Sequence, residues 1–177
     1  FGGRMAEFQR MWEQVIREWS ERWGPLVRGW WIDGVYDLPG MYRHPDAPNA
    51  ASFAAAMRAG NPESIIGLNV GVKAPIVSAD PVEDYTAGET NHPQLIDSPG
   101  RWLEGKQFHM LSFLGRFWGV GEPRFSDQQV MEFTQSLTRY GGVVTWGVPI
   151  EIDGRIREPY VRQLRVLGAA MAEDRAA

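Results

Sequence analysis

Hydrophobic side chains recur at every third or fourth position across residues 5–23, and Arg, Glu and Gln fill most of the positions between them. This spacing places the apolar residues on one face of an α-helix. Gly24 and Pro25 end the pattern, since proline has no amide hydrogen with which to continue a helix. Residues 26–32 are mostly apolar, which is typical of a short buried strand. The chain therefore begins with a predicted helix followed by a predicted strand.

The same kinds of element follow a polar connection. Residues 37–49 are rich in Pro, Asp, Asn and Gly, which predicts a long loop. Asn49 is a suitable N-cap for a helix through residue 59, and residues 64–70 have the pattern of a second strand. Residues 71–105 form a second long loop, and loops of this length in compact domains are usually functional or disordered.

The third strand and its helix lie beyond this loop. Residues 107–114 are predicted as a strand, and a partly helical structure of residues 102–114 is the alternative. Ser126 and Gln129 have the spacing of a capping box, in which each side chain bonds the other residue's backbone amide. The helix that they begin ends at Gly141-Gly142.

A strand over residues 143–148 and a helix from Pro159 to Met171 complete the pattern. Four strands that alternate largely with helices imply an α/β fold with a parallel sheet, and long loops after the strands are typical of a (β/α)8 barrel of the TIM type. Four strands are about half of such a barrel. We expect residues 1–177 to be one partial barrel domain whose N-terminal strands would precede Phe1.

Composition excludes several functional classes. The chain has 44% hydrophobic residues, a net charge of −4 and no basic stripe, which argues against nucleic acid as a partner. No run approaches the roughly 20 apolar residues that cross a membrane, so no membrane partner is expected. The absence of cysteine excludes thiol nucleophiles and zinc-thiolate sites but leaves the cellular compartment undetermined. Without metal-ligand spacing or a phosphate-binding glycine loop, no cofactor is expected.

Two acids lie at or after the ends of neighbouring predicted strands. Asp33 directly follows the first strand, and Glu89 lies in the long loop after the second. Chemistry in barrels is placed at this end of the strands, and two carboxylates facing one pocket are what glycoside hydrolysis requires. The alternative is that both are solvated loop acids, since the chain contains 22 acidic residues.

Several motifs resemble, in order, those of the α-L-fucosidases of glycoside hydrolase family 29. Trp31-Ile32-Asp33-Gly34 is similar to that family's W-x-D-G strand end, and residues 65–69 are similar to its next strand, which ends in asparagine. Residues 83–89 (E-D-Y-T-A-G-E) resemble its G-D-[FY]-x-T-x-E loop. Residues 117–119 (F-W-G) resemble S-W-G-Y, and residues 149–156 resemble P-x-x-D-G-x-I.

The resemblance implies a retaining glycoside hydrolase that releases a terminal fucose-like sugar through a covalent intermediate. Asp33 would be the nucleophile and Glu89 the acid/base, with Glu83 and Asp84 as rivals for the second role. Retention requires the two carboxyl groups to lie about 5–5.5 Å apart. A general acid also has to be partly desolvated, and Tyr85 or Trp118 would be its apolar neighbour.

Five further residues are expected to bind the substrate or support the acids. Trp31 and Asn69 belong to the two matched strand ends, and His92 is close enough to Glu89 in sequence to orient it. Trp118 lies in the matched F-W-G segment. Trp146 would either stack on an apolar sugar face or fill the top of the barrel.

Departures from the family pattern sustain an alternative function. The family's N-x-R is Asn69-Val70-Gly71 in this chain, so the arginine that contacts the sugar or orients the acids is missing. A carbohydrate-binding or pseudoenzyme relative on the same barrel, without hydrolysis, is therefore the second hypothesis. In either case the expected partner is a fucosylated glycan or oligosaccharide. Because half a barrel has open edges, we also expect the fragment to be inactive alone and to form a homo-oligomer or require the missing half.

Overall fold

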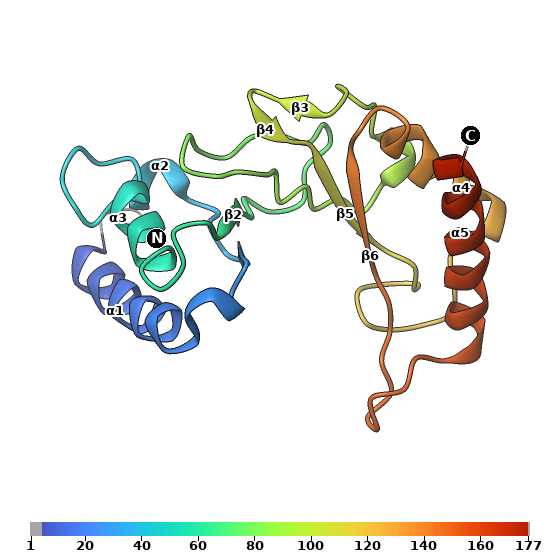
Figure 1. Cartoon of the computed structure of the whole chain (residues 1–177), viewed down its shortest axis with the longest axis horizontal. Coiled ribbons are helices and arrows are strands. Elements are labelled where there is room, and N and C mark those ends of the chain that lie inside the picture. Colours follow the sequence, from blue (N-terminus) through green and yellow to red (C-terminus); the bar gives the residue numbers. More distant parts are fainter. Residues whose placement is uncertain (1–4, 177) are drawn as a thin grey trace. The chain divides into compact units, whose positions relative to one another are not determined.

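The computed structural model describes residues 5–176, which form helices and short strands in alternation (Figure 1). The chain divides into two compact units. The first unit comprises Phe1–Lys73, Val77–Ala87 and Glu104–Lys106. The second comprises Ala74–Ile76, Gly88–Leu103 and Gln107–Ala177. Each unit has its own hydrophobic core and is described separately.

The first unit contains two parallel strands and the helices that connect them. β1 pairs with β2 in parallel, and Ile32 at the end of β1 lies opposite Leu68 at the end of β2. The apolar core behind the strands includes Phe53, Met57 and Ile66, which are almost completely buried. The elements in chain order are α1 (Ala6–Trp23), η1 (Gly24–Leu26), β1 (Gly29–Ile32), α2 (Leu38–Met41), α3 (Ala50–Met57) and β2 (Ile65–Leu68).

The second unit repeats this arrangement with a second parallel pair, β5 and β6. His109 at the start of β5 lies opposite Val143, and Phe113 at its end lies opposite Gly147. Helices α4 and α5 pack on this pair through Leu114, among other residues. The remaining elements in chain order are η2 (Pro93–Leu95), β3 (Trp102–Leu103), β4 (Lys106–Gln107), β5 (His109–Phe113), α4 (Asp127–Thr138), β6 (Val143–Gly147) and α5 (Glu158–Ala176).

The predicted alternation of strands and helices is confirmed, and residues 107–114 contain a strand rather than a helix. Two segments expected to be loops contain regular structure. The short helix α2 forms within residues 37–49 because the Asp37 carboxylate accepts the Gly40 amide at 3.2 Å. The 3-10 turn η2 and the strand β3 form within residues 71–105, and β4 begins directly after them at residue 106.

The architecture is mixed α/β, but its strands do not close into a barrel. Residues 5–176 contain three separate sheets of two strands each. The complete TIM-type barrel of which this chain would be half therefore stays a prediction. None of the helices within the described part of the chain is both long and apolar enough to span a bilayer.

Helix α1 is joined to the end of α3 by a close backbone contact. The Ser20 hydroxyl donates to the Met57 carbonyl at 2.7 Å and accepts the Gly60 amide at 2.9 Å. A Cβ at residue 60 would lie 1.8 Å from the Ser20 carbonyl oxygen. Only glycine fits at this position without moving one of the two backbones.

We therefore expect Gly60→Ala to lower the free energy of unfolding by about 2–3 kcal/mol, because the added methyl group meets backbone and not a flexible side chain. Gly168→Ala is the matched control, since a Cβ there would have nothing within 4 Å and the residue lies in α5. Its greater helix propensity should raise stability by about 0.5–1 kcal/mol. Urea denaturation of both variants tests the contrast, and equal effects would contradict it.

Candidate functional site

Asp33 follows the last residue of β1 and is held by three hydrogen bonds. The Gly34 amide donates to Oδ1 at 2.8 Å, the Asn69 side-chain amide at 2.9 Å and the Tyr36 hydroxyl at 3.2 Å. Gly34 has a φ of +83°, a conformation that glycine adopts readily, and this turn aims its amide at the carboxylate. Within residues 5–176, each hydrogen bond that the Asp33 carboxylate accepts is accepted by Oδ1. The Oδ2 oxygen is thus the one available to a ligand.

Asn69 is the buried partner that orients this carboxylate. Parallel pairing continues past the strands, because the Asn69 amide donates to the Ile32 carbonyl at 2.8 Å and the Val35 amide to the Asn69 carbonyl at 3.0 Å. The Gly71 amide donates to Asn69 Oδ1 at 3.0 Å, which directs the side-chain NH2 of Asn69 to Asp33. The opposite orientation of the Asn69 side-chain amide is excluded, because its NH2 group would then face the Gly71 amide N–H and two donors would meet.

Gly71 also explains the absence of the family's arginine at this position. The residue has a φ of +90°, and a Cβ there would lie 3.4 Å from the Tyr36 ring. Residues other than glycine are strained in this conformation. An arginine side chain at residue 71 would therefore be strained in the backbone conformation that this chain adopts.

Trp31 lies on the same face of the strand pair as Asp33 and Asn69. Residues two apart in a strand point to the same side, and Trp31 lies opposite Gly67 in the register. Trp30 and Ile32 point to the other side and pack against the apolar core. The structure therefore brings three of the predicted site residues to one face of the first unit.

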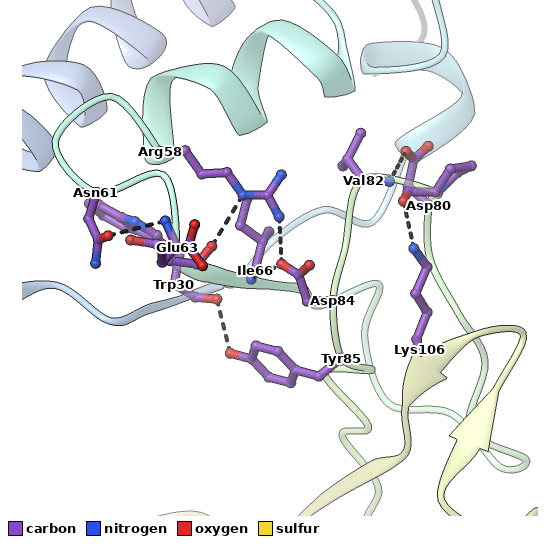
Figure 2. A network of polar contacts seen from close by, with 12 residues as sticks. Trp30, Arg58, Asn61, Glu63, Ile66, Asp80, Val82, Asp84, Tyr85 and Lys106 are labelled. Carbon is purple, nitrogen blue, oxygen red and sulfur yellow. Dashed lines mark hydrogen bonds and ion pairs between the residues drawn. The ribbon is translucent and has the colours of Figure 1, made fainter. Parts of the chain in front are cut away.

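Tyr85 packs on this face where Gly67 leaves room. A Cβ at residue 67 would lie 2.6 Å from the ring carbon Cζ of Tyr85. The Tyr85 hydroxyl donates to the Trp30 carbonyl at 2.9 Å, as Figure 2 shows. Burial, together with the negative charges of Asp84 and Glu83, raises the pKa of Tyr85 to about 12. Tyr85 is thus a neutral hydrogen-bond donor that fixes the strand.

Asp84 has a structural role at the side of β2. Its Oδ2 accepts the Ile66 amide at 2.8 Å and pairs with the Arg58 guanidinium at 2.6 Å (Figure 2). Arg58 also donates to the Ser64 carbonyl at 3.2 Å. The predicted rival acid thus anchors the end of α3 to β2.

Glu83, the other rival, is a buried carboxyl group that is only 1% exposed. Its Oε1 accepts the Ala79 amide at 2.7 Å. Burial raises the pKa of Glu83, and hydrogen bonds from Ala79, Ser78 and Leu68 and the positive charge of Lys106 offset this only in part. A group that is closed to solvent in this way is not accessible to a sugar.

Glu89 lies in the second unit, beside the middle of β5. It forms a parallel β-bridge with Leu111. The Leu111 amide donates to the Gly88 carbonyl, and the Thr90 amide donates to the Leu111 carbonyl, each at 2.9 Å. A Cβ at residue 88 would lie 1.9 Å from the His109 carbonyl oxygen, so glycine is required there. The Glu89 side chain is half-buried, and its role as general acid stays a prediction.

Arg124 fixes the chain immediately after Glu89. Its guanidinium donates to the Asn91 carbonyl at 2.8 Å, the Phe113 carbonyl at 3.0 Å and the Ser112 hydroxyl at 3.1 Å. Ser112 in turn donates to the Thr90 carbonyl at 2.8 Å. The guanidinium also lies over the Phe113 ring, 3.7 Å from its centroid. Burial lowers the pKa of Arg124.

His92 and Trp118, two other predicted site residues of the second unit, contact different residues. The exposed ring of His92 has its Nδ1 3.5 Å from Gln94 Nε2. Trp118 is half-buried, with its ring centroid 4.4 Å from that of Phe113. The predicted effect of each on Glu89 stays a prediction.

Trp146 faces the helices of the second unit. Its indole N–H donates to the Thr134 hydroxyl of α4 at 3.0 Å, and its ring packs among the residues that α4 and α5 bury. Thr145, next to it in β6, lies opposite Leu111, which in turn pairs with Glu89. By strand alternation Trp146 and Glu89 are on opposite faces of this sheet. Trp146 thus packs between the strands and the helices of the second unit, and the sugar-stacking and barrel-top roles expected for it stay predictions.

Two contributors were missed from the sequence. Tyr36 gave no pattern, because its contact with Asp33 depends on the turn at Gly34. Arg124 lies in the connection between β5 and α4, where a charged residue is usually exposed. Only the fold shows that the rings of Phe113 and Phe125 lie against its guanidinium.

Asp33 belongs to the first unit and Glu89 to the second, and the expected separation of their carboxyl groups stays a prediction. Within residues 5–176, no group of three or more His, Asp or Glu side chains is arranged so that it could bind a metal ion.

Comparison with known proteins identifies the fold. No family model and no curated protein matches the chain. Solved structures do match, among them the endo-fucoidan hydrolase MfFcnA4 of glycoside hydrolase family 107, with 23% identity and a TM-score of 0.74 over 94% of this chain and 30% of that one. MfFcnA9 of the same family has 20% identity and the same TM-score over 94% of this chain and 37% of its own.

A more distant match is the α-L-fucosidase AlfC from Lactobacillus casei in complex with its α-L-fucose product. The identity is 16% and the TM-score 0.58, over 93% of this chain and 44% of that one. At these identities the likeness is one of fold. The chain spans about a third of the length of MfFcnA4 and MfFcnA9.

The buried carboxyl group of Glu83 predicts a measurable effect of pH on stability. Its pKa in the folded state is raised above the ordinary value of 4.5, so the folded state binds the proton more tightly than the unfolded state does. This stabilisation is complete below the unfolded pKa and is lost as the pH rises through the folded pKa. Glu83→Gln cannot ionise, and its stability relative to wild type should increase from about pH 4 to about pH 8. Urea midpoints that run parallel across this range would refute the assignment.

The contacts of Arg124 predict that lysine cannot replace it. A lysine has no planar fork with which to reach three acceptors, so Arg124→Lys should lower the free energy of unfolding by about 2 kcal/mol. It should also speed hydrogen exchange at the Thr90 amide, which lies in the segment that Arg124 holds. Arg139→Lys at the exposed end of α4 is the control and should change stability by less than about 0.5 kcal/mol. Equal losses in both variants would exclude the clamp.

Proposed function

We propose that this chain is part of a retaining glycoside hydrolase that acts on fucose-containing glycans, with Asp33 as nucleophile and Glu89 as acid/base. The observation that carries the proposal is the Asp33 carboxylate at the end of a parallel strand. Its Oδ1 is held by three donors and its Oδ2 is left for a ligand. A nucleophile needs this fixed orientation, because misplacement by about 1 Å costs on the order of 100-fold in rate.

In the proposed first step, Asp33 Oδ2 attacks the anomeric carbon while the bond from that carbon to the leaving oxygen breaks. Glu89 gives its proton to the leaving oxygen. A water then attacks the same carbon, the bond to Asp33 breaks, and Glu89 takes the proton of the water. The three donors on Oδ1 stabilise the carboxylate whenever Asp33 carries its full charge.

Several features support Glu89 over its rivals. Glu83 is closed to solvent, and Asp84 is paired with Arg58 and the Ile66 amide. Glu89 is half-buried and its backbone is fixed on both sides by β5. A general acid requires such partial burial and a fixed position.

The fold favours a fucose-containing polysaccharide as the substrate. The endo-fucoidan hydrolases MfFcnA4 and MfFcnA9 match with TM-scores of 0.74, and the α-L-fucosidase matches with 0.58. An internal linkage of such a polymer is therefore a second candidate beside the terminal fucose implied by the family 29 resemblance. A non-hydrolytic carbohydrate-binding relative is the remaining alternative, in agreement with Gly71 in place of arginine.

The test is hydrolysis of 4-nitrophenyl α-L-fucopyranoside and of fucoidan by the chain and by a longer polypeptide that contains it. We expect Asp33→Gly to lower kcat by on the order of 10⁴-fold or more and azide to restore part of the activity, since azide can occupy the place of the missing carboxylate. Asp97→Asn, at an exposed loop position, is the matched control and should retain full activity.

A fluorinated fucoside that traps the covalent intermediate provides the second measurement. Labelling of Asp33 would support the retaining mechanism. Binding of fucosylated oligosaccharide without labelling or turnover would establish the carbohydrate-binding alternative. Hydrolysis that persists in Asp33→Gly without azide would exclude Asp33 as nucleophile.

A further inference from the structure

Helix α1 exposes an unusually apolar face. Six large side chains lie along one side of it: Met5, Phe8, Trp12, Val15, Trp19 and Trp23. Each is between 37% and 48% exposed. We call this set the α1 stripe. A soluble protein rarely leaves a continuous apolar surface of this kind uncovered.

The stripe is exposed because α1 attaches to the first unit by a different edge. The buried residues of α1 are Gln9, Ile16 and Ser20. Gln9 donates to the Met41 carbonyl, and Ser20 donates to the Met57 carbonyl. At 100° per residue this edge lies roughly 80° around the helix from the centre of the stripe. The helix is therefore anchored largely by polar contacts, and its most apolar face points away from the core.

The spacing of the stripe identifies a helix as the fitting partner. Met5, Phe8, Trp12, Val15 and Trp19 follow one another at intervals of three, four, three and four residues. This is the alternation of the a and d positions of a coiled coil, which places a continuous seam against a second helix. A lipid surface fits less well, because the polar face carries both signs of charge, such as the ion pair of Glu18 with Arg22 at 2.8 Å, and is not predominantly basic.

We infer that the α1 stripe is a dimer interface that packs against the same stripe of a second copy of this chain. An isologous contact places the same apolar patch of both copies against each other, so each stripe would cover the other and the assembly would close after two copies. Aromatic side chains bury roughly 150–250 Å² each, so the exposed part of the stripe offers on the order of 450 Å² per copy. The total of about 900 Å² lies in the range of weak, reversible interfaces.

Sedimentation velocity of the 177-residue chain from about 1 µM to about 500 µM tests the inference. We expect a reversible monomer–dimer equilibrium with a dissociation constant in the micromolar range. The double variant Trp12→Gln/Trp19→Gln removes two large aromatic side chains from the interface and should raise the dissociation constant of the dimer by at least about tenfold. Trp102→Gln is the matched control, since this tryptophan is 53% exposed and lies outside α1, and it should leave the equilibrium unchanged.

A second variant separates loss of the interface from loss of the fold. Val15→Glu adds a like charge at the middle of both seams and removes neither of the Trp12–Trp19 and Trp19–Trp23 contacts. It should be monomeric with an unchanged circular dichroism spectrum. A chain that is monomeric at every concentration, or an association that persists in Val15→Glu and in the double tryptophan variant, would overturn the inference.

Discussion

The parallel pairing of β1 with β2 is the interaction on which the candidate nucleophile depends. Parallel strands end at the same edge of a sheet, so the residues that follow them are brought together. Asp33 and Asn69 are 36 positions apart and meet at 2.9 Å for this reason. The backbone bonds between Asn69 and residues 32 and 35 extend the pairing just far enough to fix both side chains.

Around this pair, three polar side chains of the first unit hold the strands and an adjoining turn. Asp84 and Tyr85 bond to β2 and β1 by side chains, and Glu83 holds the turn at Ala79. Hydrogen bonds offset the cost of burying Asp84 and Tyr85, and they offset that of Glu83 in part. The acids that a motif makes conspicuous are therefore not all available for catalysis.

In the second unit, a half-buried arginine side chain fixes the backbone beside the candidate acid/base. Arg124 joins the end of β5 to the segment after Glu89, and the aromatic rings of Phe113 and Phe125 cover its guanidinium. Arginine suits this position because its planar fork satisfies several carbonyl groups at once and stacks on aromatic rings. In the first unit these contacts hold the Asp33 carboxylate itself, and in the second they hold the backbone of the segment that carries Glu89.

The sequence by itself determined the order of strands and helices, the caps of the helices, and Asp33 as the acid at a strand end. These depend on local periodicity and capping, which involve residues only a few positions apart. The tertiary structure decided which acids are structural, the face on which Trp146 lies, and the contributions of Tyr36 and Arg124. Such properties depend on strand register and on contacts between distant residues, and a shift of register by one position would move every side chain to the opposite face.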